Sequence, residues 1–170
     1  MKMKDIRGFE TVIEPFEERH AKEVLELIVG IQQNEFGISI SASDQPDLIN
    51  IPDFYRKGRG NFWVATYEGR VVGTIALLDI GGRMAALRKM FVDASFRGKE
   101  RGIAYALLQV LISWSEDHGI QVIYLGTTPK FLAAHAFYEK NDFVEIQKRD
   151  LPETFPVMKV DSKFYKLEVR

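Results

Sequence analysis

Cysteine is absent from the 170 residues, and histidine occurs only three times. The absence of cysteine excludes disulfides, thiolate metal sites and a cysteine nucleophile. The histidines, His20, His118 and His135, lie far apart and have no ligand-like spacing. We therefore expect no metal site.

An excess of one charge and a long apolar run are also lacking. The 23 basic and 24 acidic residues leave a net charge of −1, whereas domains that bind phosphate backbones normally carry a basic excess. The longest apolar stretch, Val71 to Leu78, is interrupted and far too short to cross a bilayer. The first residues carry charges with no apolar run behind them, unlike a secretory signal. We therefore expect a cytoplasmic protein with neither nucleic acid nor a membrane as partner.

The composition is that of an ordinary globular domain. Hydrophobic residues make up 46% and charged residues 28% of the chain, which excludes a disordered protein. A chain of this length is typical of one domain. We expect residues 1–170 to form a single domain, while the sequence leaves the oligomeric state open, a homodimer included.

Hydrophobic periodicity predicts an α/β fold built on one mixed, mostly antiparallel sheet with helices on both faces. Residues 38–60 follow neither period and are expected to form a long loop. The expected strands are 9–14, 61–68, 71–80, 84–92, 122–125, 143–146 and 164–169, and the expected helices are 16–36, 130–140 and one that begins at 103 and that Gly119 closes.

The junction from Val92 to Ala104 carries the first chemical signal. A strand ends, a basic loop with Gly98 and Gly102 follows, and a helix begins. Glycines let backbone N–H groups converge, and the start of a helix adds the positive end of its dipole, so the junction suits a phosphate or pyrophosphate. An ordinary strand-to-helix turn with exposed charges is the alternative. The spacing is neither that of a Walker loop nor that of a dinucleotide fingerprint.

Two motifs appear in order along the chain. The first is the strand, loop and helix from Leu87 to Trp114, and the second is YLGTT at 124–128 followed by AHAFYEKNDF at 134–143. Together with the order of elements, they resemble the GNAT superfamily of acetyl-CoA-dependent N-acetyltransferases, in which the last segment reads A-x-x-h-Y-E-K-x-G-F, with h apolar. The resemblance covers nearly the whole chain and is weakest over 38–60.

The resemblance implies acetyl-CoA as cosubstrate and transfer of its acetyl group to a primary amine, by direct attack in a ternary complex. The acceptor would be a small molecule or a peptide, and we expect residues 36–60 to shape its choice. Backbone groups of Met90, Phe91 and Val92 would pair with the pantetheine arm as an added strand does. Tyr138 would protonate the departing thiolate, and Ala134 and Phe137 would line the channel. The residues implied to hold the pyrophosphate are Arg97, Gly98, Lys99, Arg101, Gly102, Ile103 and Ala104.

The sequence departs from the family pattern at several positions. The loop is two residues longer than usual, so whether Arg97, Lys99 or Arg101 faces phosphate stays open. Phe131 stands where many members have asparagine, and Asp142 replaces a glycine, a mild change because Asp tolerates left-handed backbone.

The strand before the loop lacks the glutamate that some relatives use as a base. Glu35, Asp44 or Asp53 acting through water, or an amine that loses its proton unaided, are the options that the sequence leaves. The missing glutamate and Phe131 favour an alternative function, a non-catalytic acyl-CoA-binding sensor or assembly module, whereas the retained Tyr138 argues for an enzyme.

Overall fold

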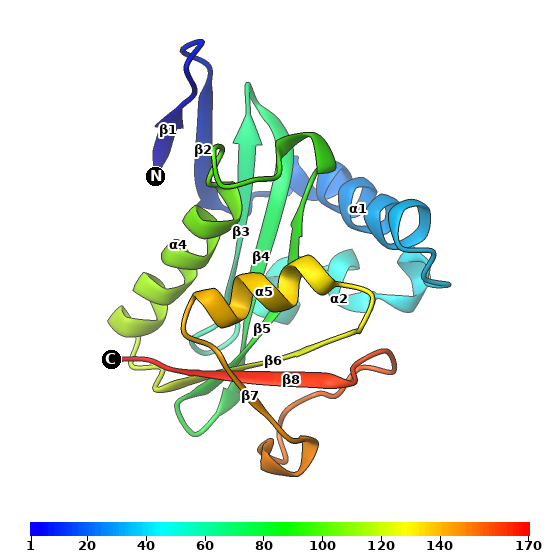
Figure 1. The fold of residues 1–170 in the computed structure, drawn as a ribbon, viewed down its shortest axis with the longest axis vertical. Coiled ribbons are helices and arrows are strands. Elements are labelled where there is room, and N and C mark those ends of the chain that lie inside the picture. The colour runs from blue at the N-terminus through cyan, green and yellow to red at the C-terminus, as the bar shows by residue number, and fades with distance from the viewer.

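The computed structural model describes residues 1–170 and contains one sheet of eight strands (Figure 1). The strand order is β1-β2-β3-β4-β5-β6-β8-β7, and every neighbouring pair is antiparallel except β5 and β6. The predicted mixed, mostly antiparallel sheet is thereby confirmed. The strands are β1 (Lys2–Lys4), β2 (Glu10–Pro15), β3 (Asn61–Tyr67), β4 (Arg70–Gly81), β5 (Met84–Val92), β6 (Val122–Thr127), β7 (Val144–Ile146) and β8 (Lys163–Glu168).

Helices cover both faces of the sheet, as the sequence predicts. They are α1 (Ala21–Gly30), α2 (Pro46–Ile49), α3 (Ile51–Tyr55), α4 (Ile103–Asp117) and α5 (Leu132–Lys140). One apolar cluster joins α1, α2 and α3 to one face, and a larger cluster joins α4 and α5 to the other. None of the helices has the length and apolarity that a membrane crossing requires.

The expected loop over 38–60 is wrong in part, because it contains α2, α3 and a 3-10 turn at Ala42–Asp44. The two prolines that predict breaks, Pro46 and Pro52, instead occupy the first turn of α2 and of α3. Proline is favoured there because the first N–H groups of a helix have no internal partner. This segment packs against the sheet and is not an exposed loop, because Leu48, Ile51 and Tyr55 are buried.

β5 carries a bulge in the middle of its length. Lys89 and Met90 together lie opposite the single residue Ile75 of β4. Lys89 has a φ of 51°, in the left-handed region, and its carbonyl accepts a hydrogen bond of 2.6 Å from the Thr74 hydroxyl. The extra residue shifts the alternation of the strand: odd-numbered residues pack toward α4 before the bulge, and even-numbered ones do so after it.

β5 and β6 pair only at their beginnings. The parallel pairing joins Met84–Ala86 to Val122–Tyr124, and β6 then continues beside β8 alone. Figure 1 shows β6 turning away from β5 beyond this point. From Leu87 to Val92, one edge of β5 therefore has no neighbouring strand.

Candidate active site

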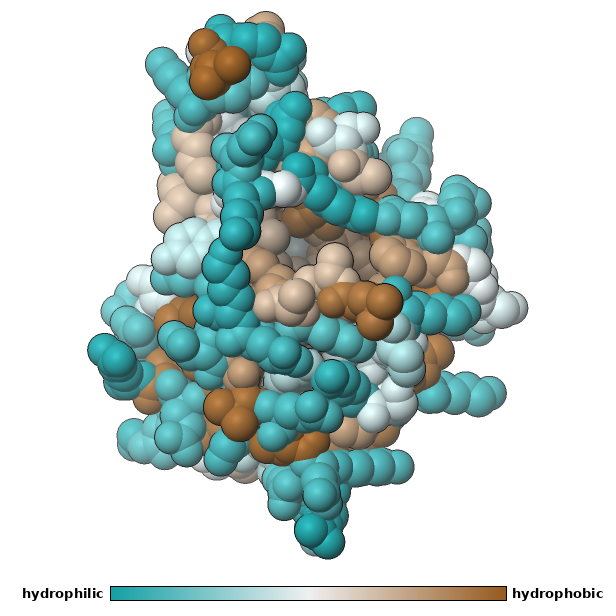
Figure 2. Space-filling view, viewed as in Figure 1, coloured by the Kyte–Doolittle hydropathy of each residue, from teal (hydrophilic) through white to brown (hydrophobic).

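A cavity of about 1100 Å³ occupies the opening between β5 and β6. Leu87 to Val92 form one wall, and Leu125 to Thr128 form the opposite wall. The loop before α4, one side of α5, the residues that follow α1 and the segment before β8 line the rest of it. Figure 2 shows the hollow near the centre of this face, bordered by apolar side chains and rimmed by hydrophilic ones.

All but two of the residues predicted for the site line this cavity. They are Met90, Phe91, Val92, Arg97, Gly98, Lys99, Gly102, Ala104, Ala134, Phe137 and Tyr138. The side chain of Ile103 is buried in the core that α4 forms with the sheet. The guanidinium of Arg101 lies 4.8 Å above the centre of the Phe96 ring, away from the cavity.

The start of α4 presents backbone N–H groups without a side-chain cap. Gly102 precedes the helix with a φ of 66°, and no side chain accepts a hydrogen bond from the first turn. Gly98, at a φ of 112°, provides the other left-handed turn of this loop. The first amides of a helix have no partner within it, so this end of the cavity offers hydrogen-bond donors to an anion.

Basic side chains outnumber acidic ones on the cavity wall. The basic residues are Arg88, Lys89, Arg97, Lys99, Lys130 and Lys140, and the one acidic residue is Asp161. The Lys99 side chain faces Lys140 and holds the pKa of the Lys140 ammonium below its ordinary value. Arg97 is engaged differently: it pairs with Glu35, and its Nε donates to the Val92 carbonyl at 2.8 Å.

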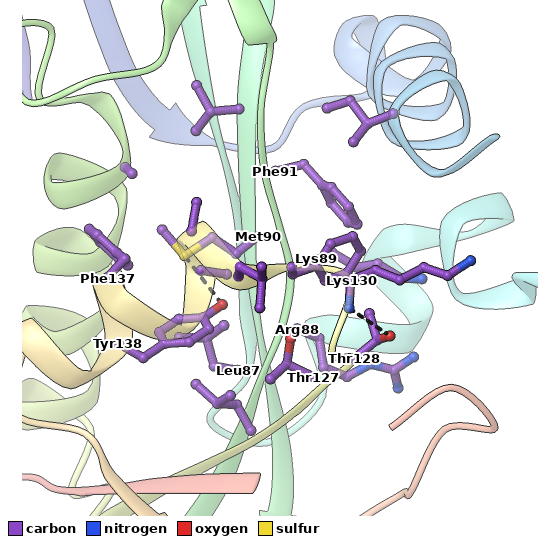
Figure 3. A pocket seen from close by; sticks show the side chains of 18 of the residues that line it. Leu87, Arg88, Lys89, Met90, Phe91, Thr127, Thr128, Lys130, Phe137 and Tyr138 are labelled. Atoms are coloured by element: carbon purple, nitrogen blue, oxygen red, sulfur yellow. Dashed lines mark hydrogen bonds between the residues drawn. The ribbon is translucent and has the colours of Figure 1, made fainter. Parts of the chain in front are cut away.

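Tyr138 points from α5 toward β5 across the cavity (Figure 3). The residue is 6% exposed, and its hydroxyl has one hydrogen-bond partner, the Met90 Sδ, to which it donates at 3.7 Å. Phe143 and Tyr165 pack around its ring at 5.4 and 6.0 Å between ring centres. This burial raises the pKa of the Tyr138 phenol, which therefore stays protonated over the physiological range.

The positions that depart from the family pattern have clear structural roles. Phe131 precedes α5, lines the cavity and meets the Phe36 and Phe91 rings edge-on at 4.6 and 6.3 Å. It therefore contributes apolar surface where many members offer an amide. Asp142 has a φ of 71°, the left-handed conformation that a glycine would adopt there.

None of the three carboxylates considered as bases lines the cavity. Glu35 pairs with Arg97, Asp44 accepts hydrogen bonds from Ser41, and Asp53 lies beside the Asn50 amide. The carboxylate that does line the wall is Asp161, in the segment before β8. Its Oδ2 accepts a 2.9 Å hydrogen bond from the Met158 amide, and burial raises its pKa.

The sequence did not predict a buried polar cluster that lies at the bulge of β5. Arg88 and Lys89 both approach the Asp47 carboxylate, at 3.6 and 3.7 Å, and Tyr55 donates its hydroxyl to Asp47 at 2.5 Å. The ammonium of Lys89 also donates to the Gln45 side chain. Two adjacent basic residues in an otherwise apolar strand are the sequence signal that could have revealed this cluster.

The family assignment follows from a comparison with known families. The family model described as Acetyltransferase (GNAT) family matches residues 23–143, which hold most of α1, the bulged strand, the glycine loop and Tyr138. The chain belongs to the GNAT family of acetyltransferases. The resemblance that the two motifs predict is confirmed.

Solved structures of other acetyltransferases share the fold over nearly the whole chain. A Staphylococcus aureus acetyltransferase of the GNAT family is 40% identical, with a TM-score of 0.89 over 94% of this chain and 99% of that one. A Streptococcus agalactiae acetyltransferase is 28% identical, with a TM-score of 0.87 over 92% and 96%. The PaiA N-acetyltransferase of Thermoplasma acidophilum, solved in complex with coenzyme A, is 15% identical and shares the fold at a TM-score of 0.71, over 93% of this chain and 98% of that one.

Curated relatives match a smaller part of the chain. The N-acetylaspartate synthetase of Xenopus tropicalis is 38% identical over 102 residues, 59% of this chain and 37% of that protein. The human enzyme of that name is 38% identical over 99 residues, 57% of this chain and 32% of that protein. The chain thus spans about a third of the length of these relatives.

Proposed function

We propose that residues 1–170 act as one catalytic domain that transfers an acetyl group from acetyl-CoA to the primary amine of an acceptor, by direct attack in a ternary complex. The observation that carries this proposal is the opening between β5 and β6. It places an unpaired strand edge, the uncapped start of α4 and the Tyr138 hydroxyl around one cavity. Acetyl-CoA supplies the activated acetyl thioester.

The chemistry of the cavity wall fits coenzyme A. The amides at the start of α4 and the ammonium groups of Lys99 and Lys140 suit a diphosphate. The free edge of β5 from Leu87 to Val92 suits the amides of a pantetheine arm, which would pair with it as an added strand. The coenzyme A in the PaiA structure supports the same use of this fold.

The proposed reaction moves protons as well as the acetyl group. At an amine pKa near 10.4, about one acceptor molecule in a few thousand is neutral at pH 7, so the ammonium first loses a proton. The amine nitrogen then attacks the thioester carbon, the C–N bond forms and the C–S bond breaks. Tyr138 would give its phenolic proton to the departing sulfur, and the proton that the nitrogen still has to lose restores the hydroxyl, directly or through solvent.

Burial acts on both partners of this last proton transfer. It raises the pKa of the Tyr138 phenol, which makes it a weaker acid. A thiolate in the same apolar surroundings is destabilised too, and its own pKa rises. Because both pKa values rise, the difference between them changes less than either value does, and proton transfer from the phenol to the thiolate stays feasible within the cavity.

The test is binding followed by turnover. Calorimetry with acetyl-CoA, CoA and ATP should show heat with the first two only, and an amine panel should then release free thiol. The protein has no cysteine and contributes no background to a thiol assay. Binding of acetyl-CoA without turnover of any amine would favour the non-catalytic sensor, and absence of binding would contradict both functions.

A further inference from the structure

We propose that the acceptor is an amino acid, whose carboxylate is bound by Arg88 and Lys89 and whose amine faces Asp161. This inference rests on the proposed function and names the class of acceptor. It is carried by the placement of these three charged side chains on the wall of one cavity, at the bulge of β5.

The bulge explains why the side chains of two neighbouring residues, Arg88 and Lys89, lie on the same face of β5. In a regular strand, successive side chains point to opposite faces. The extra residue on β5 places Arg88 and Lys89 on the same side, so both contact Asp47 of α2. Their side chains are only 12% and 8% exposed, although both line the cavity.

The two cations at this end of the cavity face two carboxylates, Asp47 within the cluster and Asp161 beyond it. Two buried cations share one buried carboxylate, that of Asp47, while Tyr55 and Gln45 add only neutral hydrogen-bonding groups. A buried charge without a partner is costly, and burial accordingly lowers the pKa of the Lys89 ammonium. A ligand that carries both a carboxylate and an ammonium would keep this balance, because its carboxylate would pair with Arg88 and Lys89 while its ammonium paired with Asp161.

Asp161 supplies the complementary negative charge. Met158 connects it to the cations, because its amide donates to Asp161 at 2.9 Å and its sulfur lies 3.7 Å from the Arg88 guanidinium. An amino acid carries its ammonium and its carboxylate close together, so it can meet both charges at once. A polyamine would place its several positive charges against Arg88 and Lys89 and would be repelled.

The location fits an acceptor rather than the cofactor. Arg88 and Lys89 turn toward the face that α2 and α3 cover, whereas Met90, which contacts Tyr138, packs toward the face of α4. The phosphate-binding features lie at the other end of the cavity, near Gly102 and Lys99. An amine held beside the bulge can therefore approach the thioester from the side opposite to the cofactor's own path.

The experiment measures acceptor binding to the protein–CoA complex separately from turnover. Glycine, alanine, aspartate and glutamate are each compared by calorimetry with the α-carboxamide and with the amine that lacks the α-carboxyl group. Spermidine is included as a polyamine. We expect at least one amino acid to bind about tenfold or more tightly than its amide, since a buried charged hydrogen bond is lost with the carboxylate. Equal binding of acid and amide throughout, or a preference for spermidine, would overturn the inference.

Variants assign this preference to residues. Lys89→Met should reduce the ratio of acid to amide affinity about tenfold and leave CoA affinity unchanged, while Lys89→Arg should retain most of the ratio. Asp161→Asn should weaken acids and amides alike and leave their ratio intact. Lys130→Met, which removes a cation from the same cavity wall, is the matched control. An unchanged ratio in Lys89→Met would contradict the assignment, and the wild-type comparison stands even if that variant fails to fold.

The two proposals fail in different ways. Amino acids that bind with the expected preference and release no thiol would leave the carboxylate site standing and overturn the acetyltransferase proposal. Release of thiol with amines that lack a carboxylate, at rates equal to those of amino acids, would support the acetyltransferase proposal and overturn the amino-acid acceptor.

Discussion

The guanidinium of Arg97 forms a two-pronged ion pair with the carboxylate of Glu35, 62 residues earlier in the chain. Its Nε also donates to the Val92 carbonyl at 2.8 Å. Through these interactions, Arg97 links the end of β5 to the segment that follows α1. Its side chain is thus engaged with protein groups, although it belongs to the basic loop at the mouth of the cavity.

This engagement leads to an order of effects among the three basic residues of the loop. We expect Lys99→Gln to weaken CoA binding about tenfold, because Lys99 faces Lys140 at the mouth and has no carboxylate partner there. Arg97→Gln and Arg101→Gln should each weaken CoA binding by less than about threefold. Arg97 is already paired with Glu35, and Arg101 lies over the Phe96 ring. Calorimetric titration measures all three, and a loss in Arg97→Gln equal to that in Lys99→Gln would contradict the order.

Tyr138→Phe tests the proposed acid. We expect kcat to fall by about 10²- to 10⁴-fold, the usual contribution of a general acid, with little change in CoA affinity. Steady-state turnover and calorimetry measure the two quantities. Tyr124→Phe is the matched control, because Tyr124 lies on β6 and does not line the cavity. Unaltered turnover in Tyr138→Phe would remove the acid role.

The pair Lys99 and Lys140 predicts a pH dependence of cofactor binding. The contact with Lys99 holds the pKa of Lys140 below the ordinary lysine value of 10.5, and an anion placed between the two ammonium groups would raise it again. Binding of CoA should then take up protons at alkaline pH, and its affinity should fall as the pH rises through the pKa of Lys140 in the free protein. Titrations in buffers of different ionisation enthalpy detect this uptake. Lys140→Gln should reduce it, and equal uptake in that variant would contradict the assignment.

Two glycines predict opposite effects on stability. Gly30 has helical backbone angles and no atom within 4 Å of an added Cβ, so Gly30→Ala should raise the free energy of unfolding by about 0.5–1 kcal/mol. A Cβ at Gly60 would lie 2.2 Å from the Tyr55 carbonyl oxygen and 2.7 Å from that of Leu77. Gly60→Ala should therefore lower the free energy of unfolding by about 2 kcal/mol or more. Urea denaturation measures both, and destabilisation by Gly30→Ala would contradict the first expectation.

Strands and long helices were predictable from the sequence because their patterns are long enough to show a period. The strand expected at 84–92 has those bounds in the structure, and the helix expected from 103 begins there. The elements that the sequence did not predict are short: β1 has three residues, α2 has four and α3 has five. Such segments span too few residues for a period to appear, and their prolines resemble breaks rather than starts.

The candidate site was predictable where it lies on motifs that are continuous in sequence. Tyr138 and the loop around Gly98 and Gly102 belong to such motifs, and both line the cavity. Asp47 and Asp161 come from distant segments, and only the folded sheet brings them to the bulge. No local pattern marks them, so their place beside Arg88 and Lys89 became visible only in three dimensions.

The bulge at Lys89 also decides which side chains of β5 share a face. Ala85 and Leu87 before it, and Met90 and Val92 after it, pack in the same apolar cluster, with the extra residue of the bulge between the two pairs. Deleting Lys89 would leave a regular strand, in which Leu87 and Met90 stand two positions apart and still face the core, but the second cation of the polar cluster would be lost. The extra residue is therefore dispensable for the apolar face of the central strand, and what it adds is a second cation on the opposite face.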